Sequence, residues 1–192
     1  MRIRALAVTG MAVAAALTAG CSSSTSGHQS TTSHAKWAEG YSNIHDLTAH
    51  SDVAVAGSIT KVISQTVSSS NVPSTDFQLT VAKVLADKSN SGVAIGSTVV
   101  IHQTGGTAQD GTHIESDDDP LFKVGDATVV FLHQFSPGHF YVVGGPNGRF
   151  KAGSAIALNS AGAGAAAVTP LNNETVQFNG TLDQLAAEVA KP

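Results

Sequence analysis

The densest group of chemically active side chains is an acidic loop at residues 113–120, with the sequence HIESDDDP. Carboxylates at this density repel one another, and a hard cation such as Ca²⁺ relieves the repulsion by taking oxygen ligands. The spacing differs from that of an EF-hand loop. A solvated acidic loop, in which Asp119 caps the turn before the next strand, is the alternative. The residues that a metal site here would use are His113, Glu115, Asp117, Asp118 and Asp119.

Histidine is frequent, with eight residues in the chain. Three converging imidazoles bind Zn²⁺ or Cu²⁺. Neither an HxH nor an HExxH spacing occurs, so a histidine site needs ligands from distant segments. Surface or half-buried histidines without a metal are the alternative. The histidines in or beside the strands predicted below are His102, His113, His133 and His139.

A glycine-rich turn, GGPNGRF at residues 144–150, suggests a different chemistry. Its three glycines permit backbone conformations that other residues disfavour. One hypothesis is a recognition loop that presents Arg149 and Phe150 to an acidic or planar group of a partner. The alternative is a tight turn in which Arg149 pairs with the acidic residues 117–119 and Phe150 fills the core. In that case the acidic loop and the glycine turn form one structural unit.

The single cysteine, Cys21, follows a segment with the layout of a secretory signal. Arg2 and Arg4 form a charged start, residues 5–17 are apolar except for Thr9 and Gly10, and small residues lead to the cysteine. The apolar run is shorter than the roughly 20 residues that span a bilayer. One cysteine cannot close an intrachain disulfide or build a cysteine-based zinc site. Secretory cleavage with Cys21 as a free thiol is one interpretation.

The other interpretation rests on the sequence LTAGC at residues 17–21, which resembles the lipobox of bacterial lipoproteins. The Leu that this motif prefers at position −3 stands at −4 here, as Leu17, and Thr18 occupies position −3. The resemblance implies cleavage before Cys21, a diacylglyceryl group on its thiol and acylation of the new amine. Two or three acyl chains anchor a protein firmly, whereas one is marginal. We therefore expect a protein held at the extracytoplasmic face of the cell membrane.

Removal of residues 1–20 lowers the ten basic residues to eight against 14 acidic ones, a formal net charge of −6. This balance argues against nucleic-acid binding, which needs clustered Lys and Arg. Residues 22–35 contain no large apolar side chain, so residues 21–35 are predicted to be a lipidated, disordered Ser/Thr-rich tether. The remaining residues, 36–192, are long enough for one domain with a core.

Alternating apolar residues predict a mainly β domain. A short helix is expected at 42–50, and an amphipathic helix after Thr181, where TLDQ has the form of a capping box. Residues 159–170 are predicted to be flexible. Short strands with Gly-rich turns favour a small antiparallel barrel of five to six strands. The strands are expected at 52–63, 77–85, 98–103, 127–135, 140–143 and 149–152, with further short strands at 155–158 and 175–178.

The segments SDVAVAGSITKV (51–62), FQLTVAKVLA (77–86), DPLFKVGDATVVFL (119–132) and YVVGGPNGRF (141–150) resemble small OB-like barrels, including the netrin/TIMP-like group. The domain also resembles uncharacterised domains of secreted bacterial proteins. The first resemblance implies a third option, a protease-inhibitor-like module. Inhibitors of that group need disulfides and a free amino-terminal cysteine, whereas Cys21 is expected to be acylated.

No nucleophile elbow, P-loop or dinucleotide fingerprint occurs in the sequence. We therefore expect no enzyme and no cofactor. The first hypothesis is a lipid-anchored binding or interaction module of the cell envelope, with the membrane and an envelope protein or ligand as its partners. The second is a metal-binding envelope lipoprotein that uses Ca, Zn or Cu.

Overall fold

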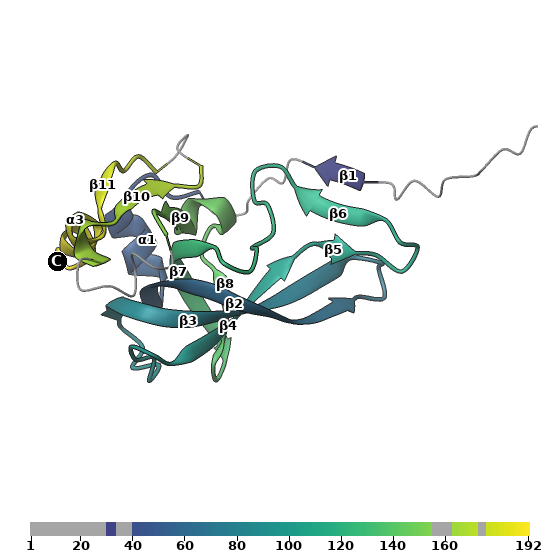
Figure 1. Cartoon of the computed structure of the whole chain (residues 1–192), viewed down its shortest axis with the longest axis horizontal. Coiled ribbons are helices and arrows are strands. Elements are labelled where there is room, and N and C mark those ends of the chain that lie inside the picture. Colours follow the sequence, from purple (N-terminus) through teal and green to yellow (C-terminus); the bar gives the residue numbers. More distant parts are fainter. Residues whose placement is uncertain (1–29, 34–39, 155–162, 173–175) are drawn as a thin grey trace, which may run out of the picture.

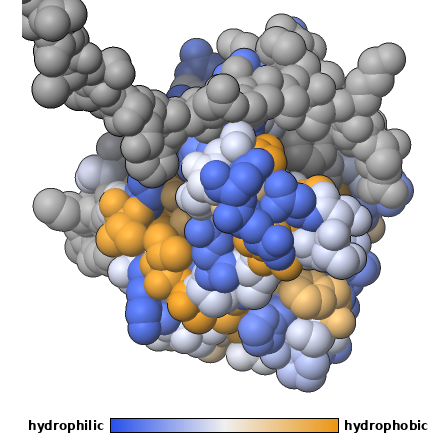
Figure 2. All heavy atoms as spheres, turned by 90° about the vertical axis from the view of Figure 1, so that its right-hand side faces the viewer, coloured by the Kyte–Doolittle hydropathy of each residue, from blue (hydrophilic) through white to orange (hydrophobic). Residues whose placement is uncertain are grey.

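Two long antiparallel strands set the frame of the fold: β2 (Val53–Val67) and β3 (Pro73–Asp87). The computed structural model describes residues 30–33, 40–154, 163–172 and 176–192. Both strands run from the helical end of the molecule to a projecting hairpin at the opposite end (Figure 1). In Figure 2, which looks onto this second end, hydrophobic patches lie among hydrophilic side chains. Exposed apolar residues of the hairpin are Val62, Ile63 and Val72.

Three further strands close a five-stranded barrel with this pair: β4 (Thr98–Thr104), β7 (Ala127–Ser136) and β8 (His139–Val142). β4 pairs with β3, and β7 pairs with β2. The ring closes because β8 pairs with β7 and with β4. This confirms the expected mainly β fold with a barrel.

One barrel pairing differs from the antiparallel prediction, because β4 and β8 run parallel. The other four pairings of the ring are antiparallel. Strand directions cannot alternate all the way round a ring with an odd number of strands, so a closed ring of five needs at least one parallel pair. The antiparallel expectation therefore holds for four of the five pairings, and the odd number of strands accounts for the fifth.

The barrel wall separates two apolar cores, because successive side chains of a strand face opposite sides. Val53 and Val55 of β2 face the barrel interior, while Ala54 and Ala56 face an outer core beneath the helices. Strand β7 contributes to both cores in the same way, as its continuous apolar run predicted. The interior is filled by Val53, Val55, Ile59, Phe77, Leu79, Val81, Val99, Ile101, Phe122, Val130, Leu132 and Phe140.

The outer core is covered by two helices, α1 (Ile44–His50) and α3 (Leu182–Val189), as predicted. Asn43 caps α1 by accepting a hydrogen bond from the Asp46 N–H. Thr181 and Gln184 form the predicted capping box of α3. Both helices lie at the left-hand end of Figure 1. No helix in the part of the chain that the structure describes is long and apolar enough to cross a membrane.

The sheet continues past β7 through β9 (Arg149–Ala152), β10 (Ala167–Pro170) and β11 (Gly180–Thr181). Short 3-10 helices lie at Gly145–Gly148 (η1) and Ala163–Ala165 (η2). Strand β10 lies where a flexible segment was expected, because pairing with β9 orders a stretch of small residues. Residues 176–178 are not a strand. The strand predicted at 155–158 lies outside the described residues.

A separate three-stranded sheet joins β5 (Gly106–Thr107), β6 (His113–Ser116) and β1 (Ser30–Ser33). β1 pairs with β6 in parallel. Residues 30–33 belong to the predicted tether, so at this point the tether is paired rather than disordered. The predicted signal segment and Cys21 lie outside the described residues.

Candidate functional site

The acidic loop and the glycine turn meet in an ion pair between Arg149 and Asp119. Both side chains are 7% exposed. The chain reaches this pair through η1, which begins after Gly144 in the left-handed conformation (φ 62°). Gly148 is needed at the other end, because a Cβ there would lie 2.3 Å from the Val143 carbonyl oxygen. The turn thus sets Arg149 at the start of β9, facing the acidic loop.

Further contacts of Arg149 and Gln103 hold the acidic loop in place. Arg149 Nη1 also donates to the Pro120 carbonyl at 2.6 Å, and its guanidinium lies 3.7 Å from the ring centroid of Phe122. Gln103 of β4 donates to the carbonyls of Asp119 and Pro120 and accepts from the Phe122 N–H. These bonds make the loop and the turn one structural unit, as the second interpretation of the turn predicted.

Burial controls the electrostatics of this unit. Desolvation raises the pKa of Asp119, although the charge and hydrogen bonding of Arg149 oppose the rise. Desolvation likewise lowers the pKa of Arg149, against the effect of Asp119. Arg149 is 6% exposed and Phe150 is 0% exposed, packed against Phe131 in the outer core. The structure therefore places the two proposed recognition residues inside the protein.

The other predicted metal ligands have separate roles. His113 Nε2 lies 3.3 Å from Glu115, whose second oxygen accepts from the Leu121 N–H. Asp117 is exposed, and Asp118 is half-buried with a partner of its own. Among the described residues no three His, Cys, Asp or Glu side chains gather into a metal-binding group. The metal site stays a prediction that none of these contacts supports.

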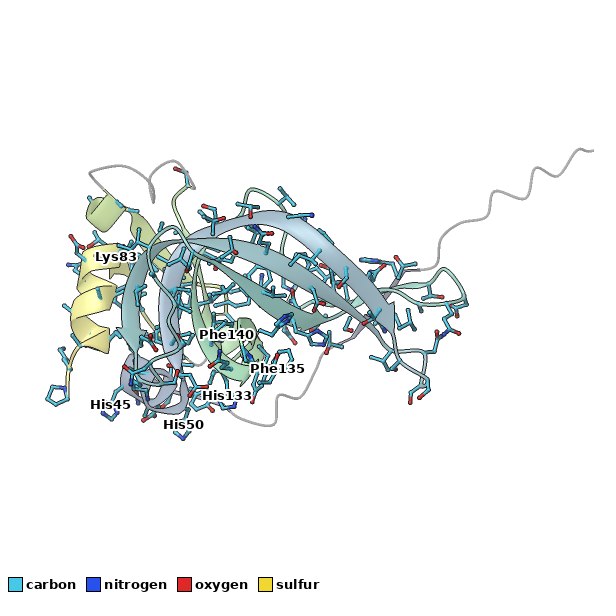
Figure 3. The ribbon with its side chains drawn as sticks, turned by 90° about the horizontal axis from the view of Figure 1, so that it is seen from below. His45, His50, Lys83, His133, Phe135 and Phe140 are labelled. Atoms are coloured by element: carbon cyan, nitrogen blue, oxygen red, sulfur yellow. The ribbon has the colours of Figure 1, made fainter. Side chains whose placement is uncertain are left out.

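A second group of side chains forms a row across the outside of the barrel. Register pairs Asp76 of β3 with His102 of β4, His102 with Tyr141 of β8, and Tyr141 with His133 of β7. The row ends at Asp52, whose Oδ2 lies 3.0 Å from His133 Nδ1. We call His102, Tyr141 and His133, together with Phe135 beside them, the exposed row. Figure 3 shows His133 and Phe135 close together on one side of the barrel.

A carboxylate faces each imidazole of the exposed row, and the carboxylate of Asp76 is hydrogen-bonded to His102. Asp76 accepts from His102 Nδ1 at 2.7 Å and from the Ser64 hydroxyl at 2.7 Å. Asp52 is held by the backbone N–H of Gln134. The hydrogen bond to Asp76 selects the His102 tautomer with the proton on Nδ1, so the neutral ring keeps Nε2 as an acceptor on its other side.

The aromatic rings of the exposed row form a platform. Phe135 and Tyr141 are 53% and 44% exposed. Their ring centroids are 6.3 Å apart and their planes differ by 23°. His133 contacts Tyr141 at 5.0 Å, and His102 contacts Phe135 at 6.1 Å between centroids. Large aromatic surface is thus held on rigid strands in contact with solvent.

The strand register also keeps the two imidazoles apart. His102 and His133 lie on β4 and β7, with Tyr141 of β8 between them. Neighbouring strands are about 4.8 Å apart, so the two residues are separated by roughly 10 Å. The Tyr141 side chain therefore occupies the position between the two imidazoles on this face of the barrel.

The sequence singled out His102 and His133 of the exposed row, but Phe135 and Tyr141 were missed. The available signal was the hairpin sequence FLHQFSPGHFYV, which places aromatic or imidazole side chains at 133, 135 and 141. These positions alternate with the buried Leu132 and Phe140. Aromatic residues on the outer positions of a hairpin indicate a binding surface.

The sequence matches no model of a protein family and no curated protein.

Proposed function

We propose that this protein is a lipid-anchored lipoprotein of the extracytoplasmic membrane face whose OB-like barrel binds a ligand and catalyses no reaction. The signal-like residues 1–20 and the lipobox-like sequence before Cys21 support the anchor. The ring order β2-β3-β4-β8-β7 with its parallel β4–β8 pair supports an OB-like topology.

The observation that carries the binding role is the exposed platform of Phe135 and Tyr141, beside the imidazole of His102 that Asp76 orients and the imidazole of His133. We propose a neutral glycan of the cell envelope as its ligand. A sugar ring offers an apolar C–H face that packs on aromatic rings, and hydroxyls that donate to Nε2 of His102. The nearby carboxylates of Asp52 and Asp76 disfavour polyanions such as nucleic acid.

The polar groups of the row also bear on catalysis. In a hydrolase triad the serine hydroxyl is hydrogen-bonded to the imidazole, so that the ring can accept the hydroxyl proton. Here the Ser64 hydroxyl donates to Asp76, on the opposite side of the carboxylate from His102. The hydrogen bond from Ser64 orients the Asp76 carboxylate, and the Ser64 hydroxyl is not activated by the imidazole. It supports a binding role for the row.

Binding to purified envelope polysaccharide tests the proposal. We expect the full-length protein to be retained on immobilised polysaccharide, and Phe135→Ala with Tyr141→Ala to abolish retention. Ile95→Ala is the matched control, since Ile95 is 72% exposed and lies outside the row. Loss of retention in the control, or equal retention of all variants, contradicts the assignment. Retention that needs added Ca²⁺, Zn²⁺ or Cu²⁺ favours the metal-binding alternative.

The anchor is tested separately. Cys21→Ala is expected to move the protein from the detergent-rich phase to the aqueous phase in detergent partitioning, because the acyl chains carry the membrane affinity. Mass spectrometry of the unsubstituted protein checks for acyl groups at Cys21. A partition unchanged by the substitution contradicts lipidation and leaves the glycan assignment untouched.

A further inference from the structure

A cavity of about 520 Å³ lies beside the Arg149–Asp119 unit. This volume is within the range of small-ligand sites, roughly 300–1,000 Å³. Two chain segments form most of its wall, residues 120–128 without Val124 and residues 149–154. Leu171 completes the lining. The cavity lies at the start of β7, whereas the exposed row lies at the end of β7, about five residues or roughly 17 Å further along the strand.

The lining concentrates positive charge in an acidic protein. Lys123, Arg149 and Lys151 are three of the eight basic residues that follow Cys21. The only acidic residue in the lining is Asp126, whose carboxylate accepts the Lys123 backbone N–H. The charge of Arg149 is neutralised by its ion pair with Asp119, which is not a lining residue. The cavity therefore offers two lysine charges to a ligand.

The two lysines are available for a ligand. Lys123 and Lys151 are exposed, and neither forms an ion pair with a described residue. In contrast, Lys83 pairs with Asp183 and Lys191 pairs with Glu188. An ammonium group at a cavity mouth attracts an oxyanion, and the attraction grows where the wall excludes water.

Part of the lining is apolar, and we call this part the inner wall. Phe122 and Phe150 lie behind this part of the lining, with Phe122 3% exposed beneath the Arg149 guanidinium and Phe150 fully buried. Arg149 is held in place by Asp119 and the Pro120 carbonyl. Leu121, Ala127 and Leu171 add further apolar surface. The lining of the cavity thus combines apolar side chains with two lysines.

We propose that this cavity binds an amphipathic oxyanion, with the anionic group between Lys123 and Lys151 and the apolar body against the inner wall. The proposal is independent of glycan binding at the exposed row, because the two surfaces share no residue. A soluble phosphate ester and the headgroup of an anionic phospholipid present the same chemistry. The experiment therefore needs a soluble and a membrane arm.

In the soluble arm, the full-length chain in neutral detergent is titrated with phenyl phosphate, inorganic phosphate and phenol by calorimetry and amide chemical shifts. We expect saturable binding of phenyl phosphate, weaker binding of inorganic phosphate and still weaker binding of phenol. The double variant Lys123→Met/Lys151→Met is expected to weaken phenyl phosphate binding about tenfold, as two modest ion pairs imply. Lys61→Met is the control, since Lys61 is exposed on β2 outside the lining.

In the membrane arm, vesicles of phosphatidylglycerol and of phosphatidylcholine compete with phenyl phosphate. Competition by phosphatidylglycerol alone identifies the lipid headgroup as the source, and no competition identifies a soluble ester. Equal binding of phenol and phenyl phosphate overturns the proposal, and so does a double variant that keeps its affinity. The urea midpoint of each variant checks that it is folded, so a loss of binding is not a loss of structure.

Discussion

Arg149 and Asp119, thirty residues apart in the chain, form a buried ion pair that joins the first residue of β9 to the loop before β7. Removing two charges from water costs several kcal/mol per ion, and only close geometry with additional hydrogen bonds offsets it. The Pro120 carbonyl and the Phe122 ring supply further contacts to the guanidinium. The pair therefore ties stability to one exact arrangement of loop and turn.

Replacing Arg149 alone is expected to destabilise the fold strongly. Arg149→Met leaves the buried Asp119 carboxylate without its partner, at a cost of about 3–5 kcal/mol in the free energy of unfolding. The double variant Arg149→Met/Asp119→Asn should recover a large part of that loss. Urea denaturation measures both effects, with the exposed neighbour Lys151→Met as control. A double variant no more stable than Arg149→Met contradicts the assigned pairing.

Gly57 is expected to tolerate no side chain. A Cβ at this position of β2 would lie 2.3 Å from the Thr80 carbonyl oxygen and 2.6 Å from Leu79. Gly57→Ala should therefore lower the free energy of unfolding by about 1–3 kcal/mol, as overpacking does. Gly40→Ala is the control, because a Cβ there has no atom within 4 Å. Thermal unfolding of the two variants compares them, and equal midpoints refute the strand contact.

The carboxyl group of Asp76 makes the free energy of unfolding depend on pH. Burial raises its pKa, but the hydrogen bonds from Ser64 and His102 and the charges of His102 and His139 outweigh burial and lower it below 3.8. A carboxyl with a lowered folded pKa stabilises the fold above its unfolded pKa, and this contribution is lost as the pH falls through the folded pKa. The stability difference between the natural protein and Asp76→Asn should therefore shrink below about pH 4.

Urea titrations at a series of pH values measure that difference. Ser64→Ala removes one of the two hydrogen bonds and should give an intermediate response. A difference that widens as the pH falls has the opposite sign and rejects the role assigned to Asp76.

The β8 hairpin offers a test of side-chain alternation. Phe140 is 0% exposed in the barrel interior, so Phe140→Ala should cost about 3–5 kcal/mol. Phe135 is 53% exposed, and Phe135→Ala should leave the free energy of unfolding within about 0.5 kcal/mol. Figure 3 labels both rings. Chemical denaturation gives both values, and a large loss for Phe135→Ala makes that ring structural and weakens the binding assignment.

Local patterns predicted much of the fold. Period-2 alternation indicated the barrel strands, and the TLDQ sequence indicated the start of α3, because both depend on neighbours close in the chain. The strand β10 and the small sheet with β5 and β6 were missed. Their small or polar residues carry no periodic apolar signal, and only pairing with distant strands orders them.

What the sequence alone determined is therefore the class of fold, the helix caps and the hypothesis of a lipid anchor at Cys21, each of which depends on adjacent residues. Tertiary structure decided which distant side chains meet. It chose burial over exposure for Arg149 and Phe150, and it aligned His102, Tyr141 and His133 across three strands. Spacing along the chain cannot show such meetings, because strand register and the parallel closure of the ring bring these residues together.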